Sequence, residues 1–89
     1  MNIDKALKSD IHLKIIRFFY ENQASIDTPR GVATWIREDR AKVKEALEDL
    51  AGLDVLVAHP VTSTTGYSFT QTKTVISKIA KFLKKHKPT

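Results

Sequence analysis

Basic and acidic side chains are separated along one short stretch of the chain, "REDRAKVKEALEDLAG" at residues 37–52. The bases Arg40, Lys42 and Lys44 come first, and the acids come last, at Glu45, Glu48 and Asp49. A helix macrodipole prefers the opposite order, in which each well-placed charge contributes about 0.3–1 kcal/mol. Grouped basic side chains attract phosphate or other acidic surfaces. The stretch therefore gives up some helix stability for a property other than folding.

Other residue types that carry chemistry are sparse. The chain has no cysteine, and His12, His59 and His86 are scattered without the spacing of metal ligands. There is no nucleophile elbow, no glycine loop for phosphate and no pair of carboxylates in an apolar setting. We therefore expect no enzyme activity, no cofactor and no metal site. The lack of cysteine is compatible with the cytoplasm, where we expect the protein to act.

The net charge of +5 is unevenly distributed over the 89 residues. Residues 1–70 carry nine Lys or Arg and ten Asp or Glu, whereas residues 71–89 carry six lysines and no acid. These lysines are either a solvated face or a surface that attracts phosphate. No apolar run is long enough to span a membrane, and no signal peptide is visible. A lysine-backed final helix could lie on an anionic membrane, but its apolar stripe is better explained by core packing.

Apolar periodicity and capping residues predict one domain over residues 1–89, with its core at 10–85. Ser9 or Asp10 caps a first helix, Thr28-Pro29 begins a short one, and Asp39 caps the next. Gly52 is expected to end that helix as its C′ residue. The expected helices are 9–23, 29–36, 39–51 and 73–85, with strand-like segments at 53–60 and 67–72 joined by the polar loop 61–66.

This order of elements resembles the winged helix-turn-helix domain of ArsR-like and MarR-like transcriptional regulators. The segment "TPRGVATWIREDRAKVKEALEDLAGLDVLV" carries the resemblance, with Val32-Ala33, Val43 and Leu47 in the expected register. The fold class it implies is α+β and mostly helical: a three-helix core, a β-wing of two or three strands, and a C-terminal helix. Such domains place the second helix of the motif in the major groove of DNA, so helix 39–51 is expected there.

The resemblance implies a double-stranded DNA partner and a role in transcription regulation. The basic front of helix 39–51 then serves as a DNA-binding edge. The turn departs from the usual pattern, since Arg37 and Glu38 occupy positions where a glycine and an apolar residue are common, and the wing has no Lys or Arg. The residues expected to contact DNA are Thr28, Arg30, Arg37, Arg40, Ala41, Lys42, Lys44, Glu45, Thr62, Ser63, Thr64 and Thr65.

Two other functions remain open from the residues themselves. The first is a protein–protein interaction module without sequence-specific DNA binding, using the acidic outward face of residues 45–49. The second is an architectural protein that binds DNA nonspecifically through its lysine tail. Trp35 is expected to be half-buried against a neighbour, with a partner contact as the alternative.

The first helix is apolar on two sides, and something must cover its second face. One cover is internal, either a short N-terminal helix with Ile3, Ala6 and Leu7 or the final helix. The other is a second copy of the chain, as in regulators that dimerise through their terminal helices. We favour this homodimer. The expected interface residues are Leu13, Ile16, Tyr20, Ile76, Ala80 and Leu83.

Overall fold

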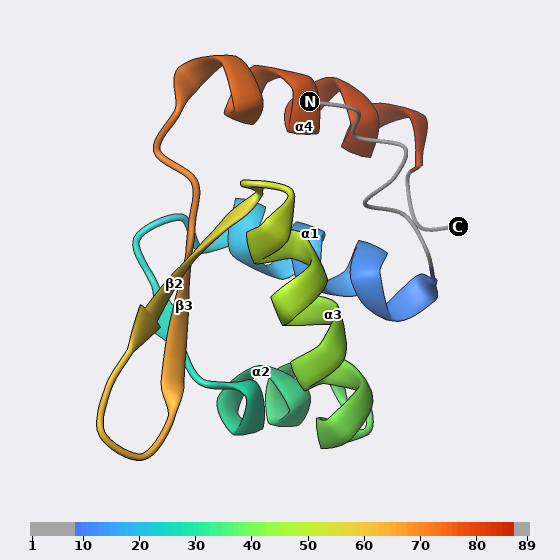
Figure 1. Ribbon diagram of the computed structural model, residues 1–89. Coiled ribbons are helices and arrows are strands. Elements are labelled where there is room, and N and C mark those ends of the chain that lie inside the picture. The colour runs from blue at the N-terminus through green and yellow to red at the C-terminus, as the bar shows by residue number, and fades with distance from the viewer. Residues whose placement is uncertain (1–8, 87–89) are drawn as a thin grey trace.

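The computed structural model describes residues 9–86 of the chain. Three helices and a small sheet form the body, and a fourth helix lies across one end (Figure 1). The elements in chain order are α1 (Asp10–Glu21), β1 (Ile26–Asp27), α2 (Pro29–Ile36), α3 (Arg40–Gly52), β2 (Leu56–Pro60), β3 (Thr65–Phe69) and α4 (Lys73–Lys85). The expected bounds of α2 and α4 are confirmed, and the class is α+β and mostly helical.

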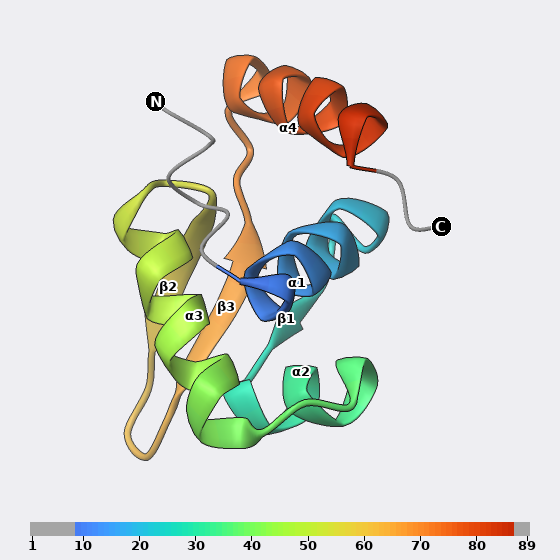
Figure 2. The same cartoon turned by 90° about the vertical axis from the view of Figure 1, so that its right-hand side faces the viewer.

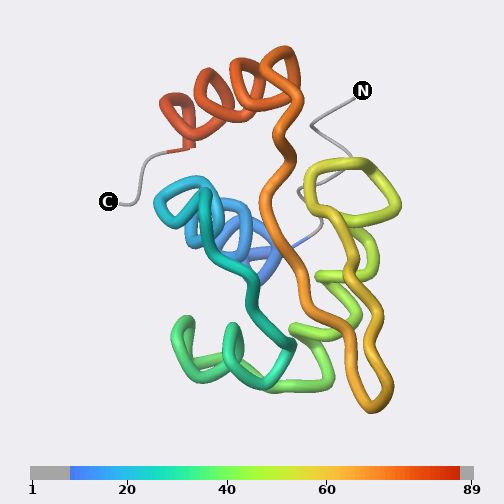
Figure 3. Tube along the Cα trace, turned by 90° about the vertical axis from the view of Figure 1, so that its left-hand side faces the viewer, coloured from blue at the N-terminus to red at the C-terminus, as the bar shows by residue number. Residues whose placement is uncertain are grey.

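The sheet has three antiparallel strands in the order β1-β3-β2. The short β1 pairs with β3 through Ile26 opposite Ser68 and Asp27 opposite Tyr67. The hairpin β2–β3 extends towards the end of the molecule that holds α2 (Figure 3). Figures 1 and 2 both place α4 at the opposite end of the molecule from α2 and the hairpin tip. The fold therefore separates the C-terminal helix from the helix-turn-helix segment.

Side-chain caps fix the start of each of the first three helices. The Ser9 hydroxyl accepts from the backbone N–H of His12 at 3.3 Å, so Ser9 rather than Asp10 is the N-cap. Thr28 Oγ1 accepts from the N–H of Gly31 at 3.2 Å, and Asp39 Oδ2 accepts from the N–H of Lys42 at 3.0 Å. Each bond satisfies a backbone donor that the helix itself leaves unpaired. The predicted caps at Thr28 and Asp39 are confirmed.

The end of α3 differs from the prediction. The helix includes Gly52, and the left-handed residue that follows it is Asp54, with φ 62°. Helical bonding continues because the N–H of Leu53 reaches the carbonyl of Asp49 at 3.2 Å. Asp54 can adopt this conformation because a short polar side chain tolerates the left-handed region better than a bulky one. The prediction that Gly52 is the C′ residue was therefore wrong.

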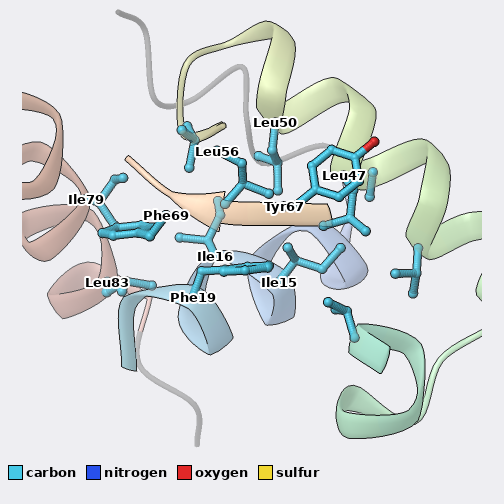
Figure 4. Close-up of a cluster of buried hydrophobic side chains, with 14 of the residues drawn as sticks. Ile15, Ile16, Phe19, Leu47, Leu50, Leu56, Tyr67, Phe69, Ile79 and Leu83 are labelled. Atoms are coloured by element: carbon cyan, nitrogen blue, oxygen red, sulfur yellow. The ribbon is translucent and has the colours of Figure 1, made fainter. Parts of the chain in front are cut away.

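One continuous core joins all four helices and the sheet (Figure 4). Ile16 and Phe19 of α1 lie beside Phe69 of β3, and Ile79 and Leu83 of α4 approach them from the other side. Ile16 is fully buried and Leu83 is only 6% exposed. Helix α4 therefore packs over part of the second face of α1 within the same chain, as one of the two internal covers predicted. The alternative with Ile3, Ala6 and Leu7 lies outside the described residues.

This packing corrects two of the residues assigned to a dimer interface. Ile16 and Leu83 cannot meet a partner because their side chains are already covered within their own chain. The apolar pattern of α1 does not show which element covers each of its faces. In the fold α1 is central and packs against both α3 and α4. Leu13, Tyr20, Ile76 and Ala80 keep partly exposed side chains.

Trp35 is 71% exposed, so the expectation of a half-buried ring was wrong. Helix α2 turns Val32 and Ala33 inward and leaves Trp35 on its outer flank. The indole contacts the ring of Phe18 at a centroid distance of 6.4 Å. Helix α2, which carries Trp35, lies at the end of the molecule opposite α4 (Figure 1).

Candidate nucleic-acid interface

A groove of about 710 Å³, with charged and hydroxyl side chains in its lining, lies between the start of α2, the outward face of α3 and the hairpin tip. These three segments are far apart in sequence, and the fold brings them to one end of the molecule (Figures 1 and 3). Three basic residues and one acidic residue line the groove. The lining residues are Thr28, Pro29, Arg30, Arg40, Ala41, Lys44, Glu48, Ser63, Thr64, Thr65 and Tyr67.

The groove collects most of the residues that the sequence assigns to DNA contact. Those that line it are Thr28, Arg30, Arg40, Ala41, Lys44, Ser63, Thr64 and Thr65. Thr62 is exposed in the same hairpin tip but does not line the groove. Arg37 lies in the turn between α2 and α3, outside it.

Lys42 and Glu45 lie on the neighbouring flank of α3, which faces α1. They line a separate depression of about 410 Å³ with Ser9, the N-cap of α1, and with residues of α1 that include His12. The reason is helical geometry, because each step of one residue turns the side chain by about 100°. Residues 41, 44 and 48 therefore follow one line along α3, while residues 42, 45 and 49 follow the next. The two lines face different neighbours.

Arg37 has backbone angles of φ 57° and ψ 49°, in the left-handed region. This is the turn position where the winged-helix pattern commonly has glycine. A residue with a Cβ is disfavoured there by about 1–2 kcal/mol. The N–H of Arg37 still bonds the carbonyl of Ala33, so the turn ends α2 properly despite the strain. The turn is also held from outside, because the ammonium of Lys14 forms an ion pair with Glu38.

Sequence reasoning missed Tyr67 as a groove residue. Its ring is buried under the hairpin, while its position opposite Asp27 and Ala58 in the sheet brings it to the wall of the groove. Burial raises the pKa of the Tyr67 hydroxyl above 10.0, and the charge of Glu48 raises it further. The alternation of Tyr67 with Phe69 indicates an inward side chain, but only the sheet register shows which residues it meets.

Glu48 was also absent from the expected contacts, although its outward position on α3 is visible from helical periodicity. It lies one turn after Lys44 along the groove. A carboxylate there could accept a hydrogen bond from the N4 amino group of cytosine. Pro29, which was missed as well, contributes an apolar edge at the start of α2.

The acid nearest the end of α3 has a structural role. Asp49 Oδ2 accepts a hydrogen bond from Nε2–H of the buried His12 at 3.0 Å. The other ring nitrogen, Nδ1, lies 2.7 Å from the Ser9 hydroxyl. Asp49 therefore joins α3 to the first turn of α1, and it does not belong to the groove. Part of the unfavourable charge order in α3 is explained by this contact.

The hairpin tip offers hydroxyl groups and backbone amides to a ligand. The N–H of Val61 bonds the carbonyl of Thr64 at 2.9 Å and closes the turn. Ser63 and Thr64 are exposed at the tip, and residues 56–69 include no Lys or Arg. Hydroxyls and amides of this kind commonly contact phosphate oxygens in protein–DNA complexes.

Within residues 9–86, no group of three or more His, Asp or Glu side chains is arranged to hold a metal ion. The helices of this described part are also too short or too polar to cross a membrane.

No family model matches the chain, and no curated protein matches it in sequence. Solved structures match it in fold. HlyU from Vibrio cholerae has 12% identity and a TM-score of 0.71, over 94% of this chain and 87% of that one. A homodimeric winged helix-turn-helix DNA-binding domain from Mycobacterium bovis, titled a possible ArsR-family transcriptional regulator, has 15% identity and a TM-score of 0.72, over 94% and 74%.

A third structure, titled a possible transcriptional regulator from Methanosarcina mazei, has 11% identity and a TM-score of 0.65, over 97% of this chain and 82% of that one. At such identities the similarity shows the fold. The chain has the winged helix-turn-helix fold, and the expected resemblance to ArsR-like regulators is confirmed at that level.

Proposed function

We propose that this winged helix-turn-helix protein binds double-stranded DNA and regulates transcription. The observation that carries the proposal is the groove, where α2, α3 and the hairpin tip bring eight of the twelve expected DNA-contact residues together. In this docking the first half of α3 enters the major groove, and the flanking segments contact the backbone. The structural neighbours from Mycobacterium bovis and Methanosarcina mazei, each described as a possible transcriptional regulator, support the same function by analogy of fold. The cytoplasm is the proposed compartment.

The side chains of the groove have distinct roles in this docking. Arg40 and Lys44 are exposed on the first turns of α3, where they can donate to guanine or to phosphate. Ala41 is exposed beside them in the same groove and presents a methyl group that can contact the methyl of thymine. Arg30, exposed on the first turn of α2, is placed to contact phosphate together with the hydroxyls of the hairpin tip.

Selection of bound sequences from a random duplex pool tests the proposal. We expect a defined preferred sequence for the native protein. Arg40→Ala should relax the preference at one or two positions and cost about 1–3 kcal/mol on the preferred duplex. Lys84→Ala, which removes a charge from the far end of the molecule, is the matched control and should keep the preference. Recovery of random sequences by the native protein would contradict sequence-specific regulation.

We also propose that the protein forms a homodimer, as the Mycobacterium bovis neighbour does. The surface proposed is the partly exposed remainder of the two terminal helices, with Leu13 and Tyr20 on α1 and Ile76 and Ala80 on α4. Partly buried apolar side chains on adjacent helices suit a two-fold contact. A dimer would carry two reading helices and bind two half-sites about one helical turn apart.

Trp35 favours a second candidate function, a module that binds another protein. An indole that is 71% exposed and tilted by 32° against the ring of Phe18 is the type of side chain that anchors a protein interface. In that case Trp35→Ala would abolish binding of the partner while leaving duplex binding unchanged. Duplex selection that yields no preferred sequence would favour this candidate over the first.

A further inference from the structure

We propose that the outer face of α4 is a second DNA-binding surface, so that one protein molecule contacts two duplex segments at once. The occupant is the phosphate backbone of a duplex other than the one read by α3. The surface consists of five lysines, Lys73, Lys78, Lys81, Lys84 and Lys85. Binding of a duplex by this surface does not depend on the proposed function. The joining of two duplexes does rest on the proposed function, because it requires α3 to hold the first duplex.

Charge on α4 has a single sign. All five lysines are exposed, the helix has no acidic residue, and none of the five takes part in an ion pair among residues 9–86. The other long helices differ, because α1 and α3 each mix acids with bases. A solvated face that served only solubility would tolerate both signs. Uncompensated charge of one sign instead attracts a polyanion.

The lysines form one face because the opposite face is committed to the core. Ile79, Phe82 and Leu83 are buried against α1 and β3. At about 100° per residue, the five lysines fall within an arc of roughly 140° centred opposite these three residues. The helix rises about 1.5 Å per residue, so the lysine face is about 18 Å long, which matches roughly five steps of 3.4 Å along a DNA strand.

A duplex suits this face better than a membrane. A helix that lies on a bilayer inserts its apolar side among the acyl chains. The apolar side of α4 is unavailable for this, since Ile79 is fully buried in the core. What remains is a row of charges that can act only by electrostatics, and the regular phosphates of a duplex are a matching partner.

The duplex on α4 must be a second one. Helix α4 lies at one end of the molecule, and α2 and the hairpin tip lie at the other (Figures 1 and 2). The molecule measures 36 Å along its longest axis. A straight duplex docked on the groove stays at the end of the molecule far from α4. Of the five lysines, Lys78, Lys81 and Lys85 point away from the stripe of Ile76 and Ala80 proposed for the dimer, so these three stay free for another segment. Joining two segments is an activity that the groove alone does not supply.

Two double variants with equal loss of charge test the proposal. Lys78→Gln with Lys81→Gln changes the α4 face in mid-helix, and Arg40→Gln with Lys44→Gln changes the reading edge. Glutamine has nearly the helix propensity of lysine, so all variants should fold. One assay follows binding of a fluorescent duplex of arbitrary sequence against salt. The other asks whether protein held on a bead-bound duplex carrying the selected sequence captures a second, labelled duplex.

We expect the native protein to capture the second duplex and the α4 variant to lose capture while keeping its preference for the selected sequence. In the background of the reading-edge variant, adding the two α4 changes should lower the salt slope by about 1.8, the value for two lost phosphate contacts. An unchanged slope in that background, or unchanged capture by the α4 variant, would overturn the proposal.

Two further results separate the proposal from its alternatives. If the reading-edge variant keeps the sequence preference while the α4 changes still lower the salt slope, the proposed docking of α3 fails and the α4 surface stands. Anionic vesicles containing phosphatidylserine provide the other arm. Lysine-dependent binding to these vesicles without lysine-dependent binding to duplex would overturn DNA as the occupant of α4.

Discussion

His12 on α1 and Asp49 on α3 are 37 positions apart in the chain, and Nε2 of the histidine lies 3.0 Å from Oδ2 of the aspartate. The histidine is buried, and Ser9 occupies its other ring nitrogen at 2.7 Å. This chain of three side chains fastens the start of α1 to the last turn of α3.

Removing Asp49 should therefore destabilise the fold. We expect Asp49→Ala to lower the free energy of unfolding by about 1–3 kcal/mol, because the Nε2–H of His12 is left buried without this acceptor. Urea denaturation measures the effect. Glu45→Ala, one turn earlier and exposed, is the matched control and should cost far less. A double-mutant cycle with His12→Ala that shows no coupling would mean that the contact contributes nothing.

Arg37→Gly should stabilise the protein. Its left-handed backbone, φ 57°, is disfavoured by about 1–2 kcal/mol for a residue with a Cβ, and the extra freedom of glycine in the unfolded chain offsets about 0.4–1 kcal/mol. A net gain of about 0.5–1 kcal/mol in the free energy of unfolding is expected. Arg37→Ala removes the same charge but keeps the Cβ, so it should bring no gain. Equal stability of the two variants would show that the turn is not strained.

The raised pKa of Tyr67 predicts that the folded protein loses stability at alkaline pH. Its pKa is raised above 10.0 in the folded protein, so the unfolded chain releases the hydroxyl proton first as the pH rises. Its contribution to stability is fully present below pH 10 and is lost as the pH rises through the folded value. Tyr67→Phe lacks this hydroxyl proton but keeps all the lysines. The pH dependence of its stability therefore comes from the other titrating groups and serves as the control. The difference in unfolding free energy between native and variant protein should therefore shrink above pH 10. A constant difference would contradict the raised pKa.

Exchanging Lys44 and Glu48 tests whether the charge order of α3 serves binding. The exchange places the acid before the base at i,i+4 and suits the helix dipole better. We expect the double variant to gain from a few tenths to about 1 kcal/mol in stability and to lose duplex binding. Thermal unfolding and a duplex titration measure the two effects. The order in α3 would serve something other than DNA if the variant were more stable and bound duplex normally.

The terminal helices allow a matched comparison of core and interface. Ala80→Glu should give a folded monomer with weaker duplex binding, because Ala80 is partly exposed on α4. Ile16→Ala should instead destabilise the protein by about 2–5 kcal/mol, since this fully buried side chain belongs to the core. Sedimentation and urea denaturation distinguish the outcomes. A native protein that sediments as a monomer at high concentration would contradict the dimer.

The sequence alone determined the local features of this protein. Thr28 and Asp39 identify their helices because a cap bonds a donor only three residues away. The bounds of α2 and α4 follow from apolar periodicity, which likewise depends only on residues that are close together in the sequence. The order of these elements was enough to predict the winged helix-turn-helix fold, and the basic front of α3 pointed to the groove.

Only the tertiary structure decided which distant residues meet. The sequence does not show that Asp49 is bonded to His12, that Tyr67 borders the groove, or that α4 packs against α1. Each depends on how whole helices and strands pack, and side-chain periodicity indicates that a face is apolar without naming the element that covers it. The separation of the α4 lysines from Arg40 also depends on how the helices pack, because the net charge of a chain does not show where its charges lie on the folded surface. Packing of α4 across α1 is what set the two basic surfaces at opposite ends.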